Sequence, residues 1–170
     1  MKALSCLVLV AALTGCASYS WRSSVPEGYR TIAVPVFENR SDVTELGAVV
    51  TRQVLREIQR EGTFEIRPTG ESALELQGVI VKTSTKAQGY RRVIESHGVG
   101  HDIEAEARVS LIDKTRGAVL FDDRVYRATA SFAAGDDVMT GERNASGRLA
   151  EEFARQIIDD ITTHDYTKGE

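Results

Sequence analysis

The sequence predicts an α+β fold, a two-layer sandwich in which two helices pack on one face of a mostly antiparallel sheet of four or five strands. Two segments, 42–61 and a later one that ends near residue 163, repeat apolar residues at helical spacing. Between them, residues 102–111 alternate apolar and polar side chains, as a half-buried antiparallel strand does. The chain has 170 residues, 42% hydrophobic and 27% charged, which suits one folded domain.

The first strand and the first helix follow each other after residue 30. Residues 31–37 read TIAVPVF and predict a strand with two apolar faces, in which Pro35 suggests an edge position or a bulge because it cannot donate to a ladder. Asp42 and Glu45 resemble a capping box that begins a helix, and Gly62 suits the end of that helix. The apolar stripe of this helix consists of Leu46, Val50, Val54 and Ile58.

Four further strands are expected. They cover 64–67, 73–86, 102–111 and 118–132, with a glycine-containing connection over 87–100. In the last strand the apolar side chains change from odd positions at Phe121 to even positions from Tyr126 onward. This change predicts a β-bulge near Asp122 and Asp123, because an extra residue reverses which side chains face the core.

The second helix starts between Val138 and Ser146 and ends near Thr163. Its apolar stripe consists of Leu149, Phe153, Ile157 and Ile161. Each helix has one apolar stripe and the sheet has one apolar face, so both helices are expected on that face. The other face of the sheet is then left to solvent or to a partner.

The N-terminus has the features of a bacterial lipoprotein signal. Lys2 precedes an apolar run over 4–13, which is too short to span a bilayer, and the run ends in Leu13-Thr14-Gly15-Cys16. An apolar residue and two small residues before a cysteine resemble the box at which that cysteine receives lipid. The alternative is an ordinary secretory signal followed by a chance cysteine.

This interpretation divides the chain into a signal peptide (1–15), a lipidated tether (16–30), one domain (31–165) and a tail (166–170). Several lipid chains on Cys16 would hold the protein stably at a membrane. Ala17 follows the cysteine where an aspartate would favour the inner membrane, so by resemblance to enterobacterial sorting we expect the periplasmic face of the outer membrane.

Composition and motifs exclude several classes of function. The net charge of −4 argues against a nucleic-acid-binding protein, and two Cys and three His exclude a cysteine-rich zinc module. No phosphate-binding loop or nucleophile motif is present, so we expect no catalytic residues and no cofactor. His97 and His101 are four residues apart, with Glu95 or Asp102 as further metal ligands. The glycines between the histidines argue against the helix that a shared site would need, so no metal is expected.

Four basic residues stand out in this acidic protein. Lys82, Lys86, Arg91 and Arg92 cluster on the distal half of a long strand and in the loop after it. Such a patch could hold phosphate groups of a lipid headgroup through charge-assisted hydrogen bonds. The alternative is pairing with acidic residues, such as Glu95 or Asp102, on neighbouring strands.

The order of these elements and one specific block resemble the lipopolysaccharide-assembly lipoprotein family, LptE. The block is residues 28–41, reading GYRTIAVPVFENRS after Tyr19, with Arg30 for the usual Lys and Ser41 for the usual Thr. Two later motifs also fit, an "L-x-G-x-I" strand and a strand ending in "V-x-L-x-D": Leu76, Gly78, Ile80, Val109, Leu111 and Asp113. The family's usual Ala-Asp before the first of these is replaced by residues 71–73, reading ESA.

The resemblance implies a role without catalysis. Such lipoproteins associate with a large outer-membrane β-barrel, LptD, and act with it in placing lipopolysaccharide in the outer leaflet. Two alternatives stay open. One is a lipoprotein that supports or activates a secretion pore or a peptidoglycan synthase, some of which begin with a similar strand. The other is a periplasmic, metal-assisted enzyme centred on His97 and His101.

Overall fold

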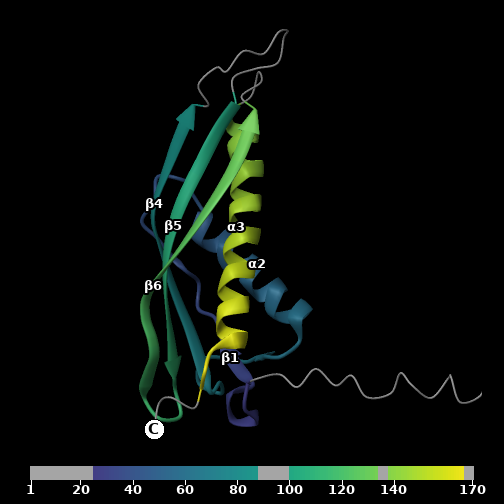
Figure 1. Cartoon of the computed structure of the whole chain (residues 1–170), viewed down its shortest axis with the longest axis vertical. Coiled ribbons are helices and arrows are strands. Elements are labelled where there is room, and N and C mark those ends of the chain that lie inside the picture. The colour runs from purple at the N-terminus through teal and green to yellow at the C-terminus, as the bar shows by residue number, and fades with distance from the viewer. Residues whose placement is uncertain (1–24, 88–99, 134–137, 167–170) are drawn as a thin grey trace, which may run out of the picture.

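The computed structural model describes residues 25–87, 100–133 and 138–166, and it confirms the α+β prediction (Figure 1). Two helices pack against one face of a mostly antiparallel sheet. The elements are η1 (Glu27–Tyr29), β1 (Thr31–Ala33), β2 (Glu38–Asn39), α2 (Leu46–Glu61), β3 (Glu65–Ile66), β4 (Leu74–Ala87), β5 (Gly100–Asp113), β6 (Ala118–Ala133) and α3 (Val138–Thr163).

Among the described residues the sheet has six strands, in the order β3-β1-β4-β5-β6, with β2 beside β4. β1 runs parallel to β3 and β4, whereas β4, β5 and β6 form a long antiparallel meander. The strand expected over 31–37 is therefore wrong in its length. It ends at Ala33, and β2 begins at Glu38, so Pro35 lies outside both ladders. β1 is also an inner strand, because β3 pairs on its outer side.

The connection between β1 and β2 is packed tightly against two glycines. The ring of Phe37 lies where a Cβ on Gly78 would be, and its carbonyl oxygen lies where a Cβ on Gly47 would be. The Phe37 backbone N–H donates to the Thr51 hydroxyl at 2.8 Å. The glycine of the "L-x-G-x-I" strand thus leaves room for the aromatic ring that joins the first strands to α2.

α2 begins without the expected capping box. The residue before it, Glu45, has left-handed backbone (φ 64°) and makes no side-chain capping bond, so that prediction is wrong. The Asn39 side chain instead accepts the Ser41 backbone N–H at 3.1 Å and shapes the loop before the helix. The end at Gly62 is as predicted, with φ 82° and an N–H bond to the Ile58 carbonyl at 3.0 Å.

Bulges decide which side chains of the long strands face the core. β4 changes register between Ile80 and Lys82. β6 changes register at the predicted place, where Asp123 has φ 51° and its N–H donates to the Ser110 hydroxyl at 3.0 Å. After the second bulge the even residues of β6 face the helices. The prediction near Asp122 is confirmed.

Both predicted helical stripes form the core. α3 starts at Val138, the earlier of the two expected positions. The stripe residues of both helices have no exposed surface, and burial of each such side chain contributes about 1.5–3 kcal/mol. In the part of the chain that the structure describes, neither helix is long and apolar enough to cross a membrane.

Both ends of the described chain are folded into the domain. Val25 and Tyr29 lie in the expected tether, and Tyr166 lies in the expected tail, yet all three are buried. The rings of Tyr29 and Tyr166 stack at 5.1 Å. η1 lies at the lower end of the molecule in Figure 1, opposite the tips of β4 and β5. β5 has fourteen residues and is therefore roughly 45 Å long, so these ends are far apart.

Candidate functional site

The open face of the sheet, on the side away from the helices, carries a ladder of charged side chains. The bulge after Ile80 turns Lys82, Ser84 and Lys86 toward this face. Their register partners on β5 are Glu106, Glu104 and Asp102. Two of the four basic residues singled out in the sequence are therefore brought to one surface.

Lys82 and Lys86 make cross-strand ion pairs on this face. Lys86 Nζ lies 2.8 Å from a Glu104 carboxylate oxygen, and Lys82 Nζ lies 3.7 Å from one of Glu106. The side chain of Lys82 remains 69% exposed and that of Lys86 remains 64% exposed. The Lys86–Glu104 pair is exposed on both sides and contributes at most about 1 kcal/mol, so a stronger anion could replace Glu104 as the partner of Lys86.

Glu106 is the centre of the ladder. Its side chain is 10% exposed, and guanidinium groups of Arg127 and Arg108 approach it at 3.1 and 4.0 Å in addition to Lys82. Arg108 also pairs with Asp123 at 2.7 Å. A single, largely buried carboxylate thus gathers cations from three neighbouring strands.

Part of this ladder surrounds a hollow of about 560 Å³. It is lined by Lys82, Ser84, Lys86, Glu104, Ala105, Glu106, Arg127, Ala128 and Thr129. The lining has one more cation than carboxylate and two hydroxyl groups. Ammonium, guanidinium and hydroxyl groups can all donate to a phosphate, so the hollow could hold an anionic headgroup at the surface.

Arg127 is the cation of this site that the sequence analysis missed, and the carboxylates of Glu104 and Glu106 were not singled out there either. Arg127 belongs to β6 and lies opposite Glu106. The residues next to Arg127 in the sequence do not form a basic cluster. Arg127 comes close to Lys82 only because both side chains pair with Glu106, on the strand that lies between β4 and β6. The change of the apolar side chains from odd to even positions near Asp123 could have placed Arg127 on the open face, but it could not have placed Arg127 beside Lys82.

Four other residues predicted for a site lie outside the described residues. They are Cys16, Arg91, Arg92 and His97. His101 is described, and its ring stacks on Phe132 at 5.4 Å. Within residues 25–87, 100–133 and 138–166, no three His, Cys, Asp or Glu side chains gather as they would around a metal.

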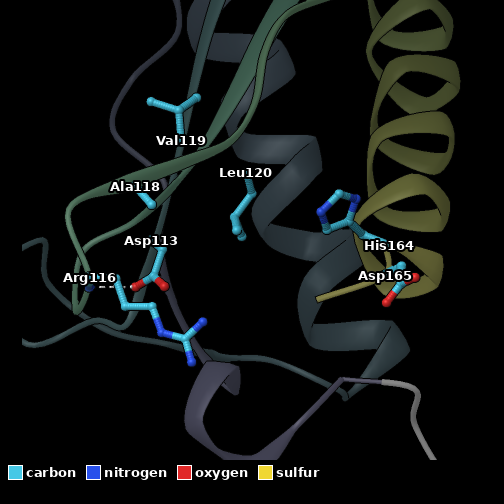
Figure 2. Close-up of a pocket in the computed structure, with 7 residues that line it drawn as sticks. All are labelled: Asp113, Arg116, Ala118, Val119, Leu120, His164 and Asp165. Atoms are coloured by element: carbon cyan, nitrogen blue, oxygen red, sulfur yellow. Dashed lines mark hydrogen bonds between the residues drawn. The ribbon is translucent and has the colours of Figure 1, made fainter. Parts of the chain in front are cut away.

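A second hollow, of about 420 Å³, lies at the opposite end of the molecule (Figure 2). Asp113 lines it, yet this carboxylate is committed to the fold. It accepts the Tyr29 hydroxyl at 2.9 Å, both donors of Thr115 and the Arg116 backbone N–H at 3.0 Å. Burial alone would raise the pKa of Asp113, but these hydrogen bonds outweigh it and hold the pKa below its ordinary 3.8.

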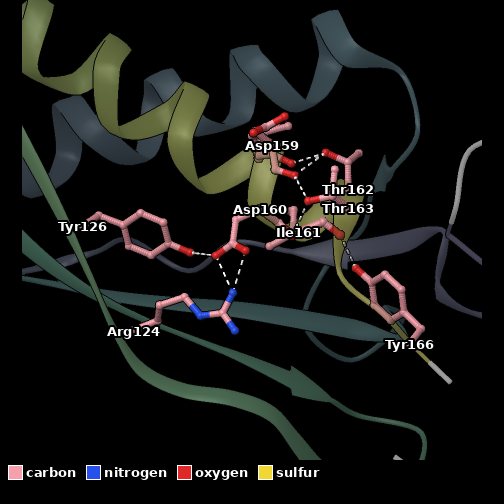
Figure 3. A network of polar contacts seen from close by, with 9 residues as sticks. Arg124, Tyr126, Asp159, Asp160, Ile161, Thr162, Thr163 and Tyr166 are labelled. Atoms are coloured by element: carbon pink, nitrogen blue, oxygen red, sulfur yellow. Dashed lines mark hydrogen bonds and ion pairs between the residues drawn. The ribbon is translucent and has the colours of Figure 1, made fainter. Parts of the chain in front are cut away.

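A third polar cluster joins β6 to α3 (Figure 3). Arg124 donates to both oxygens of Asp160 at 2.6 Å, and the Tyr126 hydroxyl donates to the same carboxylate. Burial, and then the bond to Asp160, raise the pKa of Tyr126 above its ordinary value, so its hydroxyl stays protonated. This cluster connects two elements of the fold, whereas the ladder on the open face remains accessible.

The fold and the motifs of this chain match one protein family. The model of the LptE family, described as lipopolysaccharide-assembly, matches residues 29–163. The chain belongs to the LptE family. The matched span includes Tyr29 and Asp113, which come from two separate motifs of the family resemblance and are hydrogen-bonded to each other.

Solved structures with a similar fold include two lipoproteins. Uncharacterized lipoprotein B from Nitrosomonas europaea is 15% identical, with a TM-score of 0.53, and the match covers 90% of this chain and 93% of that one. A minor lipoprotein from Acinetobacter baumannii is 10% identical, with a TM-score of 0.51, over 79% and 93% of the two chains. At these identities the likeness shows the fold alone. No curated protein matches this LptE-family chain.

Proposed function

We propose that this protein is an outer-membrane lipoprotein, lipidated at Cys16, that assembles with an LptD-like β-barrel and supports the insertion of lipopolysaccharide into the outer leaflet. The observation that carries the proposal is the LptE family match over residues 29–163. A role without catalysis is supported by the contacts of Glu106, Asp113 and Asp160, whose carboxylates each bind partners within the domain.

The open face is the proposed contact for lipopolysaccharide. Lys82 and Lys86, joined by Arg127, would donate to phosphates of its headgroup in place of Glu104 and Glu106. Arg91 and Arg92 follow β4 in the sequence and are proposed to extend the same contact. Side-chain exposures of 64% to 73% for Lys86, Lys82 and Arg127 support access from solvent.

The assembly role is tested by purification from cell envelopes. A C-terminally tagged chain is extracted in mild detergent, and the co-purifying proteins are identified and quantified. We expect a large β-barrel protein in equal amount, which is absent when the tag is on an unrelated lipoprotein. A peptidoglycan synthase or a secretion component in its place, with no barrel, would overturn the assignment.

The contact with lipopolysaccharide is tested separately on the purified full-length protein in detergent. The variant Lys82→Gln with Lys86→Gln is compared with Arg56→Gln with Arg60→Gln, which removes two cations from the helical side. Loss of two charge-assisted bonds should weaken binding of lipopolysaccharide by about tenfold or more. The helix variant is the control for the loss of two positive charges. Binding of dephosphorylated lipopolysaccharide by wild type tests whether the phosphate groups are what the protein binds. Equal affinity of both variants would exclude the open face as the contact.

A further inference from the structure

The two outer edges of the long meander differ in how they are covered. On the β6 edge, Gln156 of α3 donates to the Arg127 carbonyl at 3.1 Å, and the Arg148 guanidinium donates to the Ser131 carbonyl. Two side chains of the helix thus occupy carbonyl groups that another strand would need. Covering an edge in this way prevents pairing with a further strand.

The β4 edge is covered over only part of its length. β2 pairs with Val79 and Ile80, and the Arg40 N–H binds the Ile80 carbonyl at 2.9 Å. Beyond this point, no strand of the described chain pairs with the outer side of β4. In Figure 1 the upper part of β4 forms the margin of the sheet, with the helices on the side of β6.

The register shows which backbone groups of β4 point outward. The Arg127 carbonyl points to α3, away from β5, so Arg127 and its register partner Glu106 form a pair without mutual backbone hydrogen bonds. The backbone groups of Glu106 therefore point to β4 and meet those of Lys82. Because the direction alternates along a strand, the N–H and C=O groups of Thr83 and Thr85 point away from β5.

Charge decides which kind of strand could pair there. In an antiparallel pair of two copies centred on Ser84, Lys82 of one chain would lie opposite Lys86 of the other. Like charges directly opposite destabilise such a pair. A strand with acidic side chains at alternate positions would instead place them beside the exposed ammonium groups of Lys82 and Lys86.

We propose that the outer edge of β4 over residues 82–86 is a docking site for an extended segment of another protein, with acidic side chains at alternate positions. Backbone hydrogen bonds at Thr83 and Thr85 would provide affinity, and the two lysines would select the partner. The site does not depend on the assignment of an LptD-like barrel, since it is argued from the edges and charges of this chain alone.

The test uses purified full-length protein in detergent and two synthetic peptides, Thr-Glu and Thr-Lys each repeated four times. Millimolar Thr-Glu peptide should slow amide hydrogen exchange at Thr83 and Thr85 by about tenfold, and high salt should weaken the effect. Exchange at Thr129, on the covered β6 edge, should not change. The Thr-Lys peptide should have no effect.

Three variants separate strand pairing from side-chain effects. Thr83→Pro removes an outward N–H without removing a bond to β5 and should abolish the response, whereas Thr83→Val should keep it. Lys82→Glu with Lys86→Glu should transfer the response from the acidic to the basic peptide. No slowing by the acidic peptide, an equal response of Thr83→Pro and Thr83→Val, or amides at Thr83 and Thr85 already protected without peptide would overturn the proposal.

Discussion

Asp113 and Tyr29 illustrate at the scale of single residues how two distant motifs are joined. Tyr29 precedes β1 and Asp113 ends β5, 84 positions apart, yet the hydroxyl of one binds the carboxylate of the other. Tyr166 stacks on the same tyrosine, and its hydroxyl donates to the Ile161 carbonyl at 2.7 Å. The start of the domain, the β5–β6 turn and the segment after α3 are held together at this point.

Replacement of Asp113 by Asn should destabilise the domain by about 1.5–3 kcal/mol at pH 7, because an amide cannot accept all the hydrogen bonds that the ionised carboxylate accepts. The measurement is urea unfolding of the purified protein. Asp122→Asn, at an exposed carboxylate on the next strand, is the matched control and should change stability by less. Equal effects of the two variants would contradict this role of Asp113.

The pH dependence follows from the lowered pKa of Asp113. A carboxylate whose pKa is lower in the folded than in the unfolded state stabilises the fold above the unfolded pKa, and loses that effect as pH falls through the folded pKa. Wild-type stability should therefore fall more steeply below about pH 4 than that of Asp113→Asn. Parallel curves for the two proteins would argue against the assigned shift.

At the scale of elements, one carboxylate of α3 fixes the position of β6. Asp160 binds Arg124 and Tyr126, which share one face of the strand because they are two positions apart. The bulge at Asp123 turns this face toward the helices, the side on which Phe121 lies. The Arg124 guanidinium also lies over the Phe121 ring at 4.1 Å, from the other side of the bulge. The irregularity in β6 thus brings together the residues through which the strand contacts the helix.

Asp160→Ala should cost about 1–3 kcal/mol, because it leaves a half-exposed guanidinium and a buried tyrosine hydroxyl without their acceptor. The neighbouring Asp159 is exposed, and Asp159→Ala keeps the backbone carbonyl that Thr163 uses, so this variant should be nearly neutral. Thermal unfolding of both variants measures the difference. A neutral Asp160→Ala would mean that this carboxylate contributes nothing to the contact between α3 and β6.

At the scale of the whole molecule, the described chain begins near one end and the long strands reach the other (Figure 1). A lipid at Cys16 would lie nine positions before Val25, so the membrane would be near the end that contains η1. The tips of β4 and β5, and the charged hollow on the open face, would then extend away from the anchor. Such an arrangement suits a lipoprotein that meets its partner at a distance from its own lipid.

Cys16→Ser should abolish the incorporation of labelled fatty acid into the protein, because the thiol that carries the lipid is lost. Cys6→Ser is the matched control, since Cys6 lies within the expected signal peptide and should not affect anchoring. Labelling of cells with fatty acid, followed by capture through a C-terminal tag, measures both. Fatty-acid label retained on Cys16→Ser would contradict lipidation at this residue.

Much of the fold was predictable because it depends on local periodicity. The stripes from Leu46 and from Leu149, the alternation over 102–111 and the parity change near Asp122 each follow from which face of an element must be buried. The end of the first strand at Ala33, with a separate strand only from Glu38, was not predictable in the same way. It depends on Phe37 turning onto Gly78, a residue of a strand that comes much later in the chain.

The two helices, the long antiparallel strands, the bulge in β6 and the resemblance to the LptE family can all be recognised in the sequence, because each depends on residues close together in the chain. Contacts between distant strands follow from the three-dimensional arrangement alone. Lys82 and Arg127 meet at Glu106, and Tyr29 binds Asp113. α3 covers the outer edge of β6, whereas no strand of the described chain pairs with the outer edge of β4 beyond Ile80. Such contacts depend on strand order and register. These are set by the packing of the whole core and leave no periodic signal in the sequence.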